Sequence, residues 1–298
     1  MAALKLEGIF TAFPTPTRKE GSVDESGLRQ LIHFLLDNGV AGLVPLGGTG
    51  EYTALSPAAR ARVVAVTVEV AQRRVPVLAG VLSPGYAEAV AAGQAFERLG
   101  VDGLMVIAPF YVTPTQAGIR DYFRRYRSEV GVPVLFYDIP YRTGIVTAPE
   151  TIVAMAKDGS IIGMKACNTD VQHFNRLAGL ADASFTILSG EEGLFPTHMA
   201  LGAKGGVLAT SALVPRHWTR IYEAARAGRI AEAVAEQRRL APLLDAVFGE
   251  HNPGPLKEAL TMIGIPAGEA LPPLGPPSEA TVAKLRKAMD GLRAEGIL

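Results

Sequence analysis

Short apolar runs alternate along this chain with stretches whose apolar residues recur at helical spacing. Eight such runs precede residue 214, at 8–13, 40–46, 75–80, 103–108, 132–137, 160–165, 185–189 and 205–209. Strands that alternate with helices in this way form parallel β-α-β units. The runs are almost continuously apolar, which is typical of strands buried on both faces. The sequence therefore predicts a parallel sheet covered by helices.

The number of units favours a closed sheet. Eight β-α units in about 210 residues suit a (β/α)₈ TIM barrel of the α/β class. A doubly wound open sheet is the alternative, but the glycine fingerprint for a dinucleotide after an early strand is missing. Beyond Val214 the pattern is helical, interrupted by a proline-rich stretch at 265–277. We expect a barrel over residues 1–213 and a C-terminal helical extension packed on it over 214–298.

Several helix starts can also be predicted. Proline at the first helical position, after a serine that can cap, places one start at Ser56-Pro57. Ser22 with Glu25, and Thr147 with Glu150, have the spacing of a capping box, in which each side chain bonds the other's backbone N–H.

Composition excludes several classes of protein. The chain has 29 basic and 29 acidic residues, so nothing indicates a polycationic nucleic-acid binder or a membrane-surface protein. The single cysteine, Cys167, cannot form an internal disulfide, and the N-terminus lacks the apolar run of a secretory signal. We expect a soluble, cytoplasmic protein that binds neither nucleic acid nor membrane.

Active sites of such barrels lie at the carboxyl ends of the strands. Lys165 ends the sixth run, so its side chain leaves a buried strand at that end. A neutral lysine amine held away from bulk water can attack a carbonyl and form a Schiff base. A structural lysine paired with a carboxylate is the alternative. We predict the catalytic role.

Other polar residues follow neighbouring strands. Tyr137 could serve as a general acid and base, although a packed aromatic is an equally good interpretation. For Tyr111 a structural role is the better interpretation. A loop arginine such as Arg142 is usually a solvated surface charge, although its guanidinium group is suited to binding a carboxylate with two hydrogen bonds. The glycine-rich loop around Thr49 permits close approach of an anion to the backbone.

Metal chemistry has no support in the sequence. The five histidines are His33, His173, His198, His217 and His251. None has H-x-H or H-E-x-x-H spacing. We predict no metal site.

Together these residues resemble the dihydrodipicolinate synthase / N-acetylneuraminate lyase family of class I, Schiff-base aldolases. The resemblance spans nearly the whole chain. It is carried by Gly47-Gly48-Thr49-Gly50-Glu51, Pro109-Phe110-Tyr111, Tyr137-Asp138-Ile139-Pro140, Gly163-Met164-Lys165 and the segment Asn252-Pro253-Gly254-Pro255-Leu256-Lys257. Its implications are a pyruvate-dependent lyase that needs no cofactor, and a homotetramer built from two tight dimers.

The resemblance assigns roles by position. Lys165 would form the Schiff base with pyruvate, and Tyr137 would relay protons beside it. Tyr111 would reach across a dimer interface to complete a neighbour's relay. Thr49 and the loop amides would bind the keto-acid carboxylate, and Arg142 the carboxylate of a second substrate. Gly48 and Val207 complete the substrate-binding set.

The chain also departs from the synthase pattern. Gly48 replaces a threonine whose hydroxyl links the two tyrosines, and Asp138 replaces the usual asparagine. The nearest activity is 4-hydroxy-tetrahydrodipicolinate synthase, which condenses pyruvate with aspartate semialdehyde. The alternatives are an aldolase or dehydratase acting on a 2-keto-3-deoxy sugar acid, an enzyme like N-acetylneuraminate lyase and, remotely, a non-catalytic barrel that binds a small acid.

Overall fold

The computed structural model describes residues 4–298 and contains the predicted barrel. The strands all run parallel in one eight-stranded sheet of order β2-β1-β8-β7-β6-β5-β4-β3. Their bounds are β1 Gly8–Ala12, β2 Gly42–Val44, β3 Leu78–Val81, β4 Gly103–Ile107, β5 Val134–Asp138, β6 Gly163–Ala166, β7 Thr186–Ser189 and β8 Gly205–Leu208.

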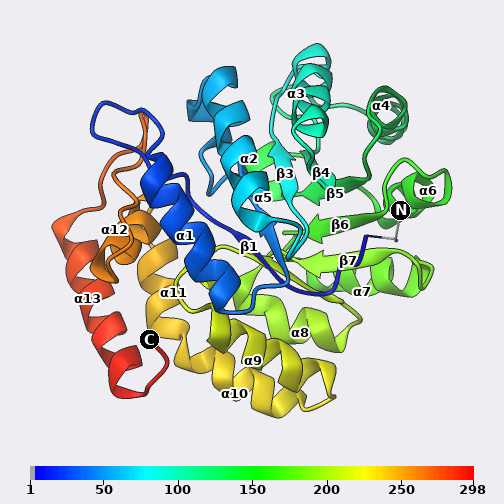
Figure 1. The fold of residues 1–298 in the computed structure, drawn as a ribbon. Coiled ribbons are helices and arrows are strands. Elements are labelled where there is room, and N and C mark those ends of the chain that lie inside the picture. The colour runs from blue at the N-terminus through cyan, green and yellow to red at the C-terminus, as the bar shows by residue number, and fades with distance from the viewer. Residues whose placement is uncertain (1–3) are drawn as a thin grey trace.

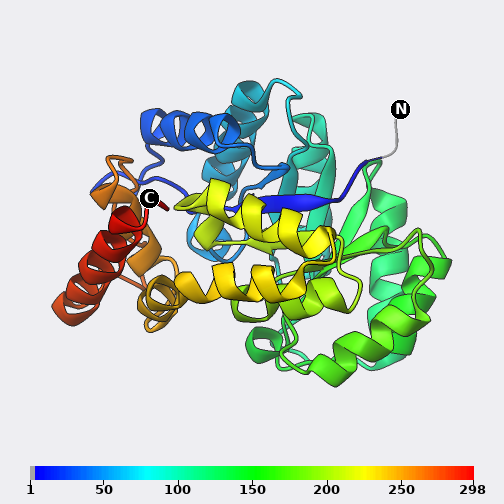
Figure 2. The ribbon, with the colours of Figure 1, turned by 90° about the horizontal axis from the view of Figure 1, so that it is seen from below.

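Helices connect and surround the strands (Figures 1 and 2). Those within the barrel units are α1 Glu25–Asp37, α2 Pro57–Ala71, α3 Tyr86–Arg98, α4 Gln116–Glu129, the short α5 Pro140–Thr143, α6 Pro149–Lys157, α7 Val171–Leu180 and α8 Phe195–Ala200. Short 3₁₀ turns lie at Tyr52–Ala54, Glu192–Leu194 and Thr210–Ala212. After β8 follow α9 Pro215–Arg226, α10 Ile230–Arg239, α11 Ala241–Phe248, α12 Gly254–Met262 and α13 Glu279–Ala294.

The sheet closes between its two outer strands, β2 and β3. Leu43 N–H donates to Pro76 O at 3.0 Å, and Gly80 N–H donates to Pro45 O at 2.9 Å. A parallel bridge joins Leu43 to Val77. These contacts confirm the TIM barrel, and because closure places all eight carboxyl ends around one mouth, residues far apart in sequence meet there.

Of the predicted helix starts, the one at Ser56-Pro57 is confirmed and the two capping boxes are not. Ser56 caps α2 as expected, accepting from Ala59 N–H at 3.2 Å. The two predicted capping boxes were wrong. Asp24 caps α1, while Ser22 donates to Glu20 instead. At α6, Ala148 occupies the cap and Pro149 begins the helix, because proline pre-sets the helical φ there.

The C-terminal helices pack on the barrel and on each other. α9 lies against β1, α10 runs beside α9 in both views, and α11–α13 form the orange-to-red layer (Figures 1 and 2). The proline-rich stretch separates α12 from α13, as the sequence predicted. No helix within residues 4–298 is long and apolar enough to cross a membrane. The division of the chain at residue 214 stays a prediction.

Candidate active site

Lys165 and Tyr137 face each other across neighbouring strands at the barrel mouth. They are register partners in the β5–β6 ladder. The Lys165 Nζ lies 4.7 Å from the centroid of the Tyr137 ring. Both side chains are buried, with exposed fractions of 8 % and 5 %. An amine and a phenol this close, away from bulk water, can exchange protons through a substrate bound between them.

A glycine after β7 makes room for the lysine. A Cβ placed on Gly190 would come within 2.8 Å of Lys165 Cε and would collide with Cys167 Sγ. The buried Cys167 donates its S–H to Gly190 O at 3.4 Å. Burial raises the pKa of this thiol well above its usual range, so Cys167 is a packed neutral group. The absence of a side chain at Gly190, just after β7, therefore leaves room for the Lys165 side chain.

The Tyr137 phenol is protonated at neutral pH. Burial is the main cause that raises its pKa well above the ordinary value, and neighbouring Cys167 and Glu191 act in the same direction. The positive charge of Arg142 partly opposes them. Arg142 is exposed in α5, directly after β5. The structure thus places Arg142 near Tyr137.

Glu191 is a site residue that sequence reasoning did not single out. It is half-buried at the end of β7 and accepts a hydrogen bond from the Tyr141 hydroxyl at 3.1 Å. Burial and the nearby Glu192 raise its pKa to about 7, while Tyr141 and Lys165 oppose the increase. The only sequence signal for Glu191 was its position just after a barrel strand. That position alone does not separate a site residue from an ordinary surface carboxylate.

The glycine-rich loop follows β2 at the same end of the barrel. Gly48 is exposed, and a Cβ there would meet no atom within 4 Å. Thr49 is buried, and its Oγ1 accepts from Asn252 Nδ2 at 2.8 Å. The loop therefore offers backbone and one oriented hydroxyl to a ligand, with open space at Gly48.

The two remaining predicted residues are Val207 and Tyr111. Val207 is fully buried in β8, paired with Phe10 of β1. Tyr111 is 96 % exposed and has a φ of +75°, a left-handed conformation that is costly for a bulky residue. Within one chain, Tyr111 does not reach the Lys165 site.

Asp138, next to Tyr137, is unusual. It is completely buried, and neither of its carboxyl oxygens has a hydrogen-bond partner within residues 4–298. Burial raises its pKa to about 7. A buried carboxyl without a partner favours the protonated form, since the ion would lose its hydration without compensation.

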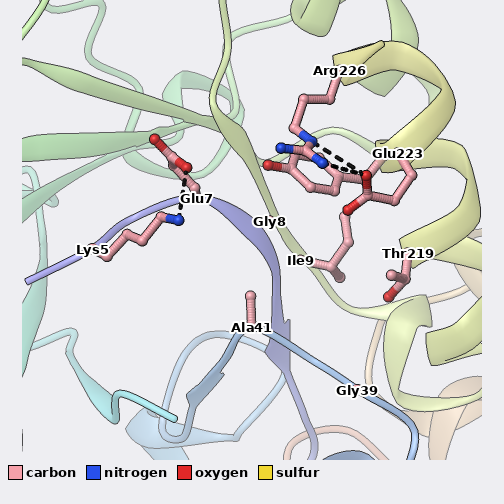
Figure 3. Close-up of a pocket in the computed structure, with 10 residues that line it drawn as sticks. Lys5, Glu7, Gly8, Ile9, Gly39, Ala41, Thr219, Glu223 and Arg226 are labelled. Atoms are coloured by element: carbon pink, nitrogen blue, oxygen red, sulfur yellow. Dashed lines mark hydrogen bonds and ion pairs between the residues drawn. The ribbon is translucent and has the colours of Figure 1, made fainter.

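A hollow of about 240 Å³ opens at the opposite end of the barrel (Figure 3). It lies beside Gly8 at the amino end of β1 and is bordered by α9. Two ion pairs line it, Lys5–Glu7 at 3.3 Å and Arg226–Glu223 at 2.8 Å. None of the predicted site residues borders it, so the carboxyl-end mouth remains the candidate active site.

Comparison with known proteins matches this arrangement. Residues 5–291 match the dihydrodipicolinate synthetase family. The chain belongs to that family. It is therefore a lyase of the class I aldolase type, and the sequence-based predictions of family and enzyme class are confirmed.

Individual relatives are similar over almost their full length. The 4-hydroxy-tetrahydrodipicolinate synthase of Acidiphilium cryptum is 38 % identical over 96 % of this chain and 98 % of its own. The structure of the same enzyme from Methylacidiphilum fumariolicum has a TM-score of 0.94 at 30 % identity, covering 98 % and 97 %. Dihydrodipicolinate synthase from Acinetobacter baumannii, solved with pyruvate, has a TM-score of 0.94 at 29 % identity, covering 99 % and 100 %.

Proposed function

We propose that this protein is a 4-hydroxy-tetrahydrodipicolinate synthase that condenses pyruvate with aspartate semialdehyde through a Schiff base on Lys165. The observation that carries the proposal is the buried Lys165–Tyr137 pair at the mouth of a TIM barrel that belongs to the dihydrodipicolinate synthetase family. The names of the similar full-length relatives support the choice of reaction.

Imine formation needs proton transfer as well as a nucleophile. The Lys165 amine attacks the keto carbon of pyruvate, one amine proton passes to the former carbonyl oxygen, and that oxygen leaves as water once it has received a second proton. Because the Tyr137 phenol is protonated at neutral pH, its first step is to donate a proton to that departing oxygen. The resulting phenolate then takes a proton from the pyruvate methyl group, which the cationic imine has acidified. The enamine formed attacks the aldehyde carbon.

The remaining residues bind the two acids. Thr49 and the backbone around Gly48 hold the pyruvate carboxylate, and Val207 lines the mouth from β8. Arg142, exposed beside the tyrosine, receives the carboxylate of the semialdehyde through its two-pronged guanidinium. No three His, Cys, Asp or Glu side chains within residues 4–298 are grouped to hold a metal ion.

The proposed site also includes a second copy of the chain. Four exposed large hydrophobic side chains follow β4 and β5 in the chain, namely Tyr111, Val112, Tyr141 and Val146. A partner subunit that covers this group would relieve the cost of exposing it and place its own Tyr111 at this mouth. We expect sedimentation equilibrium at micromolar concentration to give a dimer or the family's tetramer. A monomer would remove Tyr111 from the site.

The reaction is tested by trapping. Borohydride added with pyruvate should leave a reduced pyruvyl adduct, and peptide mapping should place it on Lys165. Pyruvate should then be consumed only when aspartate semialdehyde is present. Folded protein that yields no adduct would contradict the proposal.

One observation favours a second candidate. Gly48 leaves open space where synthases carry a hydroxyl, and Gly-Gly-Thr-Gly-Glu resembles the loop of the sugar-acid dehydratase branch. An enzyme of that branch would convert a 2-keto-3-deoxy sugar acid without added pyruvate, so the same assay distinguishes the two.

A further inference from the structure

The glycine-rich loop is fastened at three consecutive residues by distant parts of the chain. Thr15 Oγ1 donates to Gly50 O at 2.7 Å. Asn252 Nδ2 donates to Thr49 Oγ1 at 2.8 Å, and Lys257 Nζ donates to Glu51 Oε2 at 2.6 Å. Two of these three bonds come from Asn252, just before α12, and from Lys257, within α12, each more than 200 residues later in the chain. The C-terminal extension therefore reaches the active-site mouth.

The Lys257–Glu51 pair forms a fully bonded buried brace. The two side chains are 1 % and 2 % exposed. Lys257 also donates to Thr17 Oγ1 at 2.9 Å and to Glu269 O at 2.8 Å, so all three of its N–H groups are used. The other Glu51 oxygen accepts from Leu271 N–H at 2.6 Å. A buried network with every member satisfied is rigid.

This brace acts on a residue with an unfavourable backbone. Glu51 has φ +58° and ψ +35°, in the left-handed region, where residues other than glycine are held only when their surroundings determine the conformation. The chain immediately before Glu51 carries Thr49. The brace therefore fixes where the loop ends and, with it, where the Thr49 hydroxyl lies.

Asn252 then fixes the direction of that hydroxyl. Its amide N–H uses a lone pair of Thr49 Oγ1, so the Thr49 hydrogen cannot point back to the amide nitrogen. Within the part of the chain that the structure describes, no protein acceptor bonds this hydrogen. A carboxylate in the mouth would supply the missing acceptor and would form a charge-assisted bond.

We propose that Asn252 is a positioning residue, which turns the Thr49 hydroxyl into a donor toward the carboxylate of the keto acid, on a loop held by the Glu51–Lys257 brace. The inference rests on the proposed function, which assigns Thr49 to that carboxylate. It gives the C-terminal extension a part in substrate binding.

The test measures how much pyruvate is needed for half-maximal borohydride trapping. Asn252→Ala should raise this concentration roughly tenfold, the effect of one charge-assisted hydrogen bond, while trapping at saturating pyruvate stays close to wild type. Asn252→Asp keeps the size of the side chain but can only accept from Thr49 when ionised, and should raise the concentration at least as much. Gln30→Ala is the matched control, because it removes another tie to the extension, at Gly264 O, away from the loop.

Thr49→Val and the Asn252→Ala/Thr49→Val double variant separate positioning from general loosening. If Asn252 acts through the hydroxyl, its replacement adds little once that hydroxyl is gone. Additive effects, or unchanged half-saturation in both Asn252 variants with wild-type thermal stability, would overturn the inference. Failure of the proposed function is distinguishable, because wild-type protein would then form no pyruvate adduct on Lys165 at any concentration.

Discussion

Lys165→Ala is expected to abolish the borohydride-trapped adduct and to lower turnover by roughly a thousandfold or more. The reason is that the variant loses the only group in the proposed mechanism that bonds covalently to pyruvate. Binding of the keto acid should persist, because the residues proposed for its carboxylate are on other strands. Pyruvate should still protect the variant against heat, while reduction leaves the protein unlabelled.

The same experiment needs a control for folding. Lys165 fills a buried position, so Lys165→Met, of similar length and without the amine, keeps the barrel packed if alanine leaves a cavity. Exposed Lys157 at the end of α6 provides the matched surface control. Turnover near the wild-type level in either folded Lys165 variant would exclude Schiff-base chemistry at this lysine.

The fold could be predicted because its signals are local. Each buried strand is an apolar run, and each is followed by a helical pattern, so the eight runs match β1–β8. The predicted caps at Ser22 and Thr147 failed because each competes with a neighbour. Asp24 lies closer to the start of α1, and Pro149 fixes the start of α6.

The site was predictable only in part. Lys165 and Tyr137 each lie one residue before the end of a strand, and closure of the barrel necessarily gathers strand ends at one mouth. The bonds from Asn252 and Lys257 to the glycine-rich loop join residues more than 200 positions apart, and no local pattern encodes such pairs. The role of Tyr111 is even harder to predict from one sequence, because the site that it is proposed to complete lies in another subunit.

Asp138→Asn is expected to make the protein more stable at pH 8 and to leave its stability nearly unchanged at about pH 4. The buried Asp138 carboxyl has a pKa of about 7, raised by burial from 3.8. Between these values the folded chain keeps a proton that the unfolded chain has released. The free energy of unfolding therefore falls as pH rises from about 4 to 7 and stays at the lower level above pH 7.

The size of this effect follows from the same values. Raising the pKa from 3.8 to about 7 corresponds to a loss of up to about 4 kcal/mol of unfolding free energy above pH 7. Asparagine is neutral at every pH and avoids this loss. The variant should thus exceed the wild type by about 2–4 kcal/mol at pH 8, a large fraction of the ~5–15 kcal/mol that stabilises a typical protein.

Urea unfolding of both proteins at pH 4 and pH 8, at one fixed protein concentration, measures this difference. Burial also raises the pKa of Glu191 and Glu192 and lowers that of His198 and His217, so the wild type alone would mix several contributions. Subtracting the variant from the wild type at each pH cancels these other groups and isolates Asp138. Replacing exposed Asp182 with asparagine should give no such pH-dependent gain. A parallel pH dependence in wild type and Asp138→Asn would mean that the Asp138 carboxylate ionises at its ordinary pKa, with a partner for its charge inside the barrel wall.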